Sequence, residues 1–178
     1  RAWWGCAEGR WDVGRKRRAA LSGVVAGGGW KTAGRGVWER APGGQNVGNW
    51  SVMRCAPLAV AYHDDPARLA AVSVDSSRIT HADPRCTVGC AVLNRTIAGL
   101  LTDEPRPLQA ALTGVDEGVP PALQAALAGL PAGTDPAALR TSGYVVPTLP
   151  PALYDALSAA ASEAAVATRL HRGGEPDT

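Results

Sequence analysis

Four short segments of the chain carry the glycines and polar side chains that ligand sites commonly use. The first segment, residues 48–54 (GNWSVMR), is a glycine turn that leads into an apolar, helix-forming stretch. Backbone N–H groups at such a helix start attract anions such as phosphate, and Asn49, Ser51 and Arg54 add side-chain donors. The alternative is structural: Gly48 and Asn49 only turn the chain, and Ser51 caps the next helix.

A histidine and a tyrosine mark the second and third segments. His81 ends residues 76–81 (SSRITH) and stands just before an Asp-Pro pair, and Tyr144 lies in residues 143–149 (GYVVPTL). An imidazole in this position has the chemistry of a ligand contact or a general acid. The competing interpretation is that His81 caps or supports a helix, which is a common use of a single histidine.

The fourth segment places three oxygen-bearing side chains in a glycine-rich turn at the end of the chain. Residues 173–178 (GGEPDT) contain Glu175, Asp177 and Thr178 at nearly alternate positions. Carboxylate and hydroxyl oxygens are the ligands that hard cations such as magnesium and manganese prefer. The alternative is an acidic tail that is simply solvated.

Cysteine spacing raises a different possibility, a zinc site built from Cys86, Cys90 and His81. Zinc sites usually contain a C-x₂-C pair, and the two cysteines here are separated by three residues. On a helix this spacing puts both thiols on one face. We therefore predict that Cys86 and Cys90 are buried and behave as small apolar side chains.

Helical signals surround these segments and predict an all-α, single-domain bundle of short helices over residues 1–178. Asp65-Pro66 and Asp83-Pro84 each combine an N-cap residue with a proline at the first helical position. Glycine-rich residues 34–48 read as a long loop, and residues 143–146 are the only candidate strand, which Pro147 disfavours. The expected helices span about 15–26, 52–62, 66–76, 84–101, 107–115, 121–130 and 152–160, with another beginning near 162 and a single turn near 135.

Composition excludes several functional classes. The chain has 178 residues, 46% of them hydrophobic, and a formal net charge of +2, which is too small to indicate nucleic-acid binding. The basic run at residues 15–18 reads as a solvated helix face, with contact to nucleic acid as the less favoured alternative. No signal peptide or membrane-spanning stretch is visible, so we expect a cytoplasmic protein with no membrane partner and with reduced thiols.

Taken in order, the four segments resemble the motifs of the ADP-ribosylglycohydrolase family, which includes the enzyme that reverses ADP-ribosylation of dinitrogenase reductase. The family patterns are G-N-G-[SA]-x-M-R, a Thr-His pair, G-Y-V-x-x-T-L and a final G-G-D-x-D-T. The corresponding segments here are residues 48–54, 80–81, 143–149 and 173–178. Each motif alone is modest, but the ordered set covers nearly the whole chain.

The resemblance implies an all-helical hydrolase that cleaves the bond between ADP-ribose and a modified group on a protein or a small conjugate. It implies a pair of magnesium or manganese ions, with Glu175, Asp177 and Thr178 among the ligands. It gives no catalytic residue and no oligomeric state. The substrate-binding residues that it implies are Gly48, Asn49, Ser51, Met53, His81 and Tyr144.

The sequence departs from the family pattern at several points. Trp50 replaces a glycine, Glu175 replaces an aspartate, and Pro176 stiffens the terminal turn. The Thr-Asp-Asp-Thr motif that the family carries early in the chain is missing, so we expect residues 1–178 to be the carboxy-terminal part of a family domain, with half of the dinuclear site. On this expectation the chain alone is poorly stable and shows no turnover. The alternative function is that of an inactive fragment or of an ADP-ribose-binding or structural relative.

Overall fold

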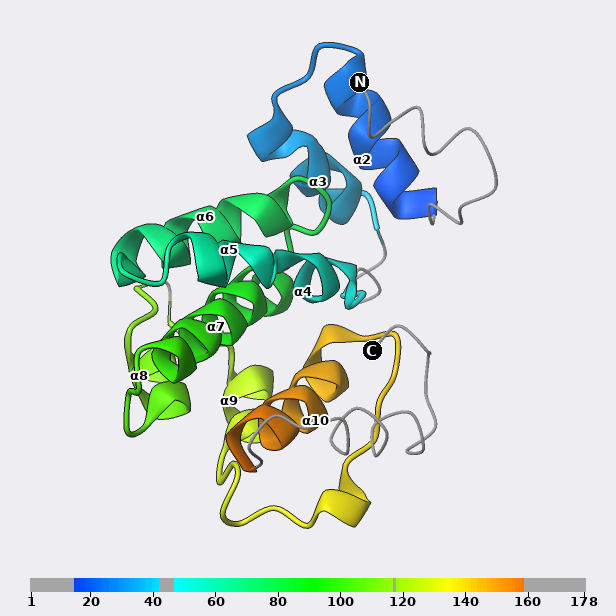
Figure 1. Ribbon diagram of the computed structural model, residues 1–178. Coiled ribbons are helices and arrows are strands. Elements are labelled where there is room, and N and C mark those ends of the chain that lie inside the picture. Colours follow the sequence, from blue (N-terminus) through cyan, green and yellow to red (C-terminus); the bar gives the residue numbers. More distant parts are fainter. Residues whose placement is uncertain (1–14, 42–46, 117, 159–178) are drawn as a thin grey trace.

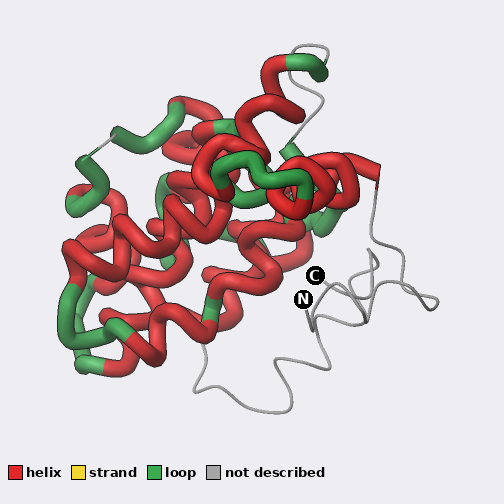
Figure 2. Tube along the Cα trace, turned by 90° about the horizontal axis from the view of Figure 1, so that it is seen from above, coloured by secondary structure: helices red, strands yellow, loops and turns green. Residues whose placement is uncertain are grey.

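The structure, a computed structural model, describes residues 15–41, 47–116 and 118–158 and consists there of helices joined by turns and loops (Figures 1 and 2). In these ranges strand pairing is limited to an isolated bridge between Gly48 and Tyr144. The prediction of an all-α fold is therefore confirmed. The helices are α2 (Arg15–Val25), α3 (Trp30–Glu39), α4 (Trp50–Cys55), α5 (Pro57–Ala61), α6 (Pro66–Arg78), α7 (Pro84–Leu101), α8 (Pro107–Thr113), α9 (Pro121–Leu127) and α10 (Val145–Ser158), with a 3₁₀ turn η2 at Pro136–Ala138.

Helix α7 is the centre of the bundle. It is the longest described helix, and α4, α5, α6, α8, α9 and α10 all pack against it (Figure 1). Helices α2 and α3 lie at one end, where α3 contacts α6. Val88, Val92, Leu123, Leu149 and Leu153 are among the fully buried side chains of the core. Because these residues come from α7, α9 and α10, one continuous core joins the middle of the chain to its later part.

The two Asp-Pro pairs begin helices as the sequence predicts. Asp65 Oδ1 accepts a hydrogen bond from the backbone N–H of Arg68 at 3.0 Å, at the start of α6. Asp83 Oδ1 accepts one from the backbone N–H of Arg85 at 2.9 Å, at the start of α7. Both carboxylates therefore satisfy N–H groups that a helix start leaves without an intrahelical partner.

The prediction of a structureless loop over residues 34–48 is wrong in its first part, because α3 covers residues 30–39. Glycine disfavours helices, and Gly34 and Gly36 both lie inside this one. Gly34 is buried where α3 meets the turn after α6: an added Cβ would overlap the carbonyl oxygen of Arg78 and lie 2.9 Å from the carbonyl carbon of Thr80. The close approach of two backbones explains why a glycine occurs here in spite of its low helix propensity.

The two largest further differences from the sequence prediction concern the helices expected over residues 52–62 and 152–160. The helix expected over residues 52–62 is divided into α4 and α5, with Pro57 at the first position of α5. Helix α10 begins at Val145, well before the expected position 152, and contains Pro150 and Pro151. The expected candidate strand at residues 143–146 is reduced to a single bridge and the first turn of this helix.

Asp83 does more than cap α7. Arg85 donates from Nε and Nη2 to its two carboxylate oxygens at 2.8 Å each, and Trp38 Nε1 of α3 donates to Oδ2 at 3.2 Å. Burial alone would raise the pKa of Asp83, but the hydrogen bonds and charge of Arg85, together with the Trp38 bond, outweigh burial and lower it. The ionised carboxylate thus ties α3 to the start of α7.

This arrangement predicts a pH-dependent contribution to stability. A carboxyl group whose pKa is lowered by folding stabilises the protein above its unfolded pKa, about 4, and this stabilisation is lost as the pH falls through the lower folded value. We expect Asp83→Asn to cost roughly 2 kcal/mol at pH 7 and to differ less from the parent protein at acid pH. The measurement is urea unfolding between pH 7 and pH 2.5.

Asp65→Asn is the matched control, because Asn is an equally good N-cap at this exposed Asp-Pro pair and no buried partner is lost. A loss of stability in Asp83→Asn that stayed constant over the whole pH range would contradict the assignment.

Candidate functional site

The Gly48–Asn49 turn lies directly against the start of α10. The Asn49 backbone N–H donates to Gly143 O at 3.0 Å, and the Val145 N–H donates to Val47 O at 2.9 Å. These two bonds form the isolated antiparallel bridge between Gly48 and Tyr144. The first and third sequence segments, far apart in the chain, are therefore joined through their backbones.

We call the contact of residues 47–49 with residues 142–148 the junction. The side chain of Asn49 strengthens it. It is 0% exposed, and Nδ2 donates to Ser142 O and to Thr148 Oγ1, both at 3.3 Å. Its Oδ1 is buried and accepts no hydrogen bond within the described part of the chain. Asn49 is the N-cap residue of α4, but its side chain makes no capping bond to that helix. The amide holds the two segments together through its donor side and leaves its acceptor side unused.

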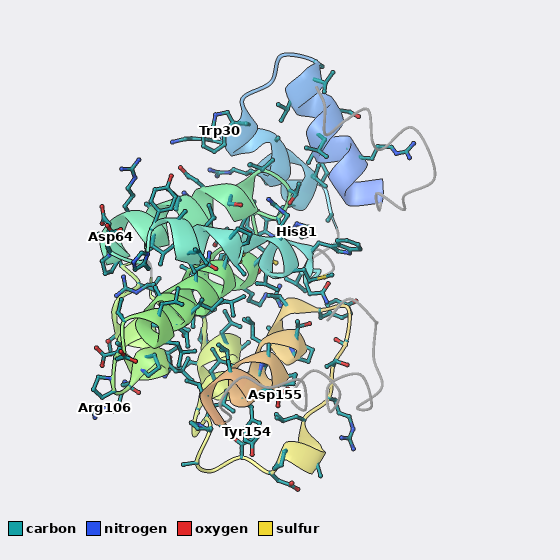
Figure 3. The ribbon with its side chains drawn as sticks, in the orientation of Figure 1. Trp30, Asp64, His81, Arg106, Tyr154 and Asp155 are labelled. Atoms are coloured by element: carbon teal, nitrogen blue, oxygen red, sulfur yellow. The ribbon has the colours of Figure 1, made fainter. Side chains whose placement is uncertain are left out.

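His81 brings the second segment to the same place. It is 3% exposed and lies near the ends of α4 and α6, below α3 (Figure 3). Its backbone is held by Ser77, which accepts from the His81 N–H at 2.7 Å and donates from Oγ to His81 O at 2.9 Å. An added Cβ on Gly48 would lie 3.5 Å from His81 Nε2, so the imidazole lies directly beside the glycine turn.

Arg54 does not extend the row of anion donors that the sequence suggests. Its Nη2 donates to Ser76 O at 2.7 Å and to Thr80 Oγ1 at 3.0 Å, and Nη1 donates to Ser76 Oγ at 3.2 Å. These bonds join α4 to the end of α6. The guanidinium therefore holds the first and second segments together.

Ser51 and Met53 have different surroundings from the rest of the first segment. Ser51 is buried, with its hydroxyl beside the thiols of Cys86 and Cys90 in the core. The structure does not bear out the alternative in which Ser51 caps α4, since that helix begins at Trp50 after Asn49. Met53 is half-buried inside α4, and its N–H donates to Asn49 O at 3.1 Å.

The cysteines near the site are buried free thiols, as the sequence predicts for Cys86 and Cys90. Burial raises the pKa of the Cys86 thiol above its ordinary range. A hydrogen bond with Cys90, together with burial, raises the pKa of Cys55. Cys55 and Cys86 therefore stay protonated at neutral pH, whereas for Cys90 burial is outweighed by hydrogen bonds with Cys55, Ser51 and Ser77, which lower its pKa. All three side chains pack as small buried groups.

Two aromatic residues flank the junction. Tyr144 is 52% exposed, and its backbone is fixed by bonds from the Tyr144 N–H to Ser142 Oγ at 3.1 Å and from Thr148 Oγ1 to Tyr144 O at 2.6 Å. Trp50 is half-buried, and its Cδ1 would lie 3.9 Å from a Cβ on Gly48. An indole and a phenol therefore stand next to the bridge that joins the two segments.

The proposed metal ligands Glu175, Asp177 and Thr178 lie outside the described residues. Within residues 15–41, 47–116 and 118–158, no three His, Cys, Asp or Glu side chains gather as candidate metal ligands. The described residues thus do not by themselves supply a donor set for the cations that the resemblance implies. In the same ranges no helix is both long and apolar enough to cross a bilayer.

Several polar residues that build the junction belong to the motifs but were not among the site residues predicted from the sequence. Thr148 accepts from Asn49 and donates to Ser142 O at 2.8 Å, and Thr80 bonds to both Arg54 and His81. Each is next to, or within a few positions of, a residue that was selected, so its place in the same short motif was the available signal. Their partners, however, come from distant parts of the chain, which local patterns do not reveal.

Fold and junction together define an all-α protein in which three glycine- and polar-rich segments meet around one histidine. The comparison with protein families identifies it further: the ADP-ribosylglycohydrolase family model matches residues 1–178, and the chain belongs to that family. No curated protein and no solved structure matches the chain.

Proposed function

We propose that this protein binds ADP-ribose conjugates at the junction of Gly48, His81 and Tyr144 and hydrolyses the bond between ADP-ribose and its acceptor. The observation that carries the proposal is the meeting of three separate family segments, with His81 Nε2 beside the Gly48 turn and Tyr144 bridged to the same turn. Family membership supports glycohydrolase activity in general.

Each part of the junction has a role in this proposal. The imidazole of His81 and the turn at Gly48 contact the diphosphate or ribose oxygens of the ligand, since both lie close together. Tyr144, half-exposed on a backbone fixed by Thr148, contacts a ring of the ligand with its aromatic face. Asn49, which is fully buried, supports the site by holding the Gly48 turn against Ser142 and Thr148. In the reaction, water replaces the nitrogen or oxygen of the acceptor on the anomeric carbon of the distal ribose.

The proposal includes magnesium or manganese held by Glu175, Asp177 and Thr178, because carboxylate and hydroxyl oxygens suit these cations. When bound, such cations supply Lewis-acid polarisation of the ribose hydroxyls. Removal of divalent cations by EDTA is expected to weaken ADP-ribose binding, and Asp177→Ala is expected to reproduce this effect in the presence of magnesium or manganese.

The direct test is calorimetric titration of the full chain with ADP-ribose, followed by an assay for ADP-ribose released from an arginine-modified protein. Heat of binding that AMP alone does not reproduce supports the binding site, and release supports the reaction. An absence of binding in magnesium and in manganese would overturn the proposal.

Gly48→Ala is expected to weaken ADP-ribose binding by about tenfold or more, because a methyl group would occupy the space between the turn and His81 Nε2. Gly48 does not adopt a left-handed backbone conformation, and the nearest atoms to an added Cβ are at ordinary contact distance, 3.5 Å or more. The change in stability should therefore be within about 0.5 kcal/mol. Calorimetry and thermal unfolding measure the two effects.

Gly23→Ala serves as the control, because it lies in α2 and an added Cβ meets nothing within 4 Å. This variant should bind ADP-ribose as the parent protein does. Equal affinities for Gly48→Ala and Gly23→Ala would remove the Gly48 turn from the binding site.

A second candidate function is ADP-ribose binding without turnover. The observation that favours it is Trp50, whose indole lies beside the Gly48 turn and reduces the room for a reacting group there. The two candidates differ in one assay: binding of ADP-ribose with no release from modified arginine or serine supports the second.

A further inference from the structure

We infer that Arg54 and Thr80 hold His81 as a neutral hydrogen-bond donor, with its proton on Nε2, the nitrogen beside the Gly48 turn. The inference rests on the proposed function in one respect, namely that the ligand binds beside Nε2. It assigns Arg54 and Thr80 as positioning residues, since both act through His81. It also specifies the ligand chemistry: a hydrogen-bond acceptor, for which the charged oxygens of a diphosphate are stronger partners than hydroxyls.

The argument begins with the hydroxyl of Thr80. Arg54 Nη2 lies 3.0 Å from Thr80 Oγ1, and a guanidinium can only donate, so Thr80 Oγ1 accepts this bond. The second contact of the hydroxyl is His81 Nδ1, at 2.9 Å. Thr80 is almost fully buried, and within the described part of the chain these two groups are the hydrogen-bond partners of Oγ1.

Only one arrangement satisfies the Thr80 hydroxyl as both donor and acceptor. A hydroxyl has one proton to donate, and the one neighbour of Thr80 Oγ1 that can accept it is His81 Nδ1. If Nδ1 carried the proton instead, the hydroxyl would receive two donors and its own proton would be buried without an acceptor. An unsatisfied buried donor is unfavourable enough to disfavour that tautomer by roughly tenfold or more.

Other bonds hold the two ends of this series of hydrogen bonds, the His81 backbone and the Arg54 guanidinium. Ser77 holds the His81 backbone on both its N–H and its carbonyl, at 2.7 and 2.9 Å. Arg54 is itself fixed by Ser76, which accepts from both guanidinium nitrogens Nη1 and Nη2. The hydrogen bonds therefore run from the Arg54 guanidinium through the Thr80 hydroxyl to His81 Nδ1, and they leave the ring proton on Nε2, beside the turn.

The functional consequence is a donor beside Gly48. A neutral imidazole with its proton on Nε2 has no lone pair at that nitrogen, so it cannot accept a proton from water there. It binds acceptor oxygens of the ligand, and it is not the general base of the reaction. A diphosphate offers several charged acceptor oxygens, whereas the hydroxyls of a free ribose are weaker, neutral acceptors.

The test is ¹⁵N NMR of the full chain labelled at histidine, in which nitrogens with and without a proton have well-separated shifts and His81→Gln assigns the signals. We expect Nδ1 of His81 without a proton and Nε2 with one, in roughly tenfold or greater excess over the other tautomer. A parent protein with the proton on Nδ1 would overturn the inference, whatever the variants do.

Thr80→Val removes the hydroxyl donor and Thr80→Ser keeps it. We expect Val to lose the tautomer preference and to weaken ADP-ribose binding by about tenfold, and Ser to restore both. A Val variant that folds and keeps the parent tautomer and affinity would overturn the role of Thr80. If the parent shows the expected tautomer but binds no ADP-ribose, the positioning by Arg54 and Thr80 is supported and the proposed function fails.

Discussion

Asn49→Asp is expected to lower the free energy of unfolding by about 3 kcal/mol, although the two side chains have nearly the same size. The reason is the direction of the buried hydrogen bonds. Asn49 Nδ2 donates to Ser142 O and Thr148 Oγ1, and the one hydroxyl proton of Thr148 is already shared between Ser142 O and Tyr144 O. A carboxylate would place an oxygen opposite these acceptors and bury a charge without a cation. Urea unfolding at pH 7 followed by circular dichroism measures the change.

Two further variants separate charge from the loss of hydrogen bonds. Asn49→Ala removes the donor without adding a charge, and we expect it to cost about 1–2 kcal/mol. Gln109→Glu makes the same amide-to-carboxylate change at an exposed position of α8, and it should alter stability by less than about 0.5 kcal/mol. If Asn49→Asp proved as stable as Gln109→Glu, the junction would not depend on the Asn49 amide.

Gly34→Ala is expected to destabilise the protein by about 2–3 kcal/mol, which is the cost of overpacking at a rigid backbone contact. The added methyl group would overlap Arg78 O and crowd Thr80 and His81 N, at 2.9 and 3.1 Å. Because these atoms belong to the turn that carries His81, α3 and the turn must separate to accept it. We therefore also expect weaker ADP-ribose binding in this variant, as measured by calorimetry.

Gly36→Ala lies on the same helix and provides the matched control. There an added Cβ meets only the flexible end of the Arg40 side chain, at 3.3 Å. Alanine favours helices over glycine, so this variant should be as stable as the parent protein or more stable by up to about 1 kcal/mol. If both variants lost a similar amount of stability, the backbone contact at Gly34 would not be the cause of the loss.

Local rules predicted those helices whose start signals are complete within a few residues. Asp65-Pro66 and Asp83-Pro84 are such signals, and α6 and α7 begin where they indicate. Helix α3 was missed because its glycines argue against a helix locally, while the reason for Gly34 is a contact with residues 78–81. Helix α10 was placed too late because its prolines normally end or kink helices, and here they are tolerated inside one.

The candidate site was predicted only in part. The order of the motifs indicated that residues near 48, 81 and 144 belong together, and the structure places these three segments in contact. The sequence did not predict that Ser51 is buried or that the Arg54 side chain bonds to Ser76 and Thr80. The direction of these side chains depends on how α4, α6 and α7 pack together. The prediction for Glu175, Asp177 and Thr178 stays a prediction, since these residues lie outside the described ranges.

The Asn49 amide bonds to Ser142 and Thr148, which lie 93 and 99 residues further along the chain. During synthesis on the ribosome, the glycine turn emerges long before Ser142 and Thr148, and until then its buried amide has no partner. Contacts of such long sequence separation form late in folding. A nascent chain stopped before residue 142 would therefore contain most of the central helices and yet could not assemble the junction, so capture of an ADP-ribose ligand should begin only after α10 has docked.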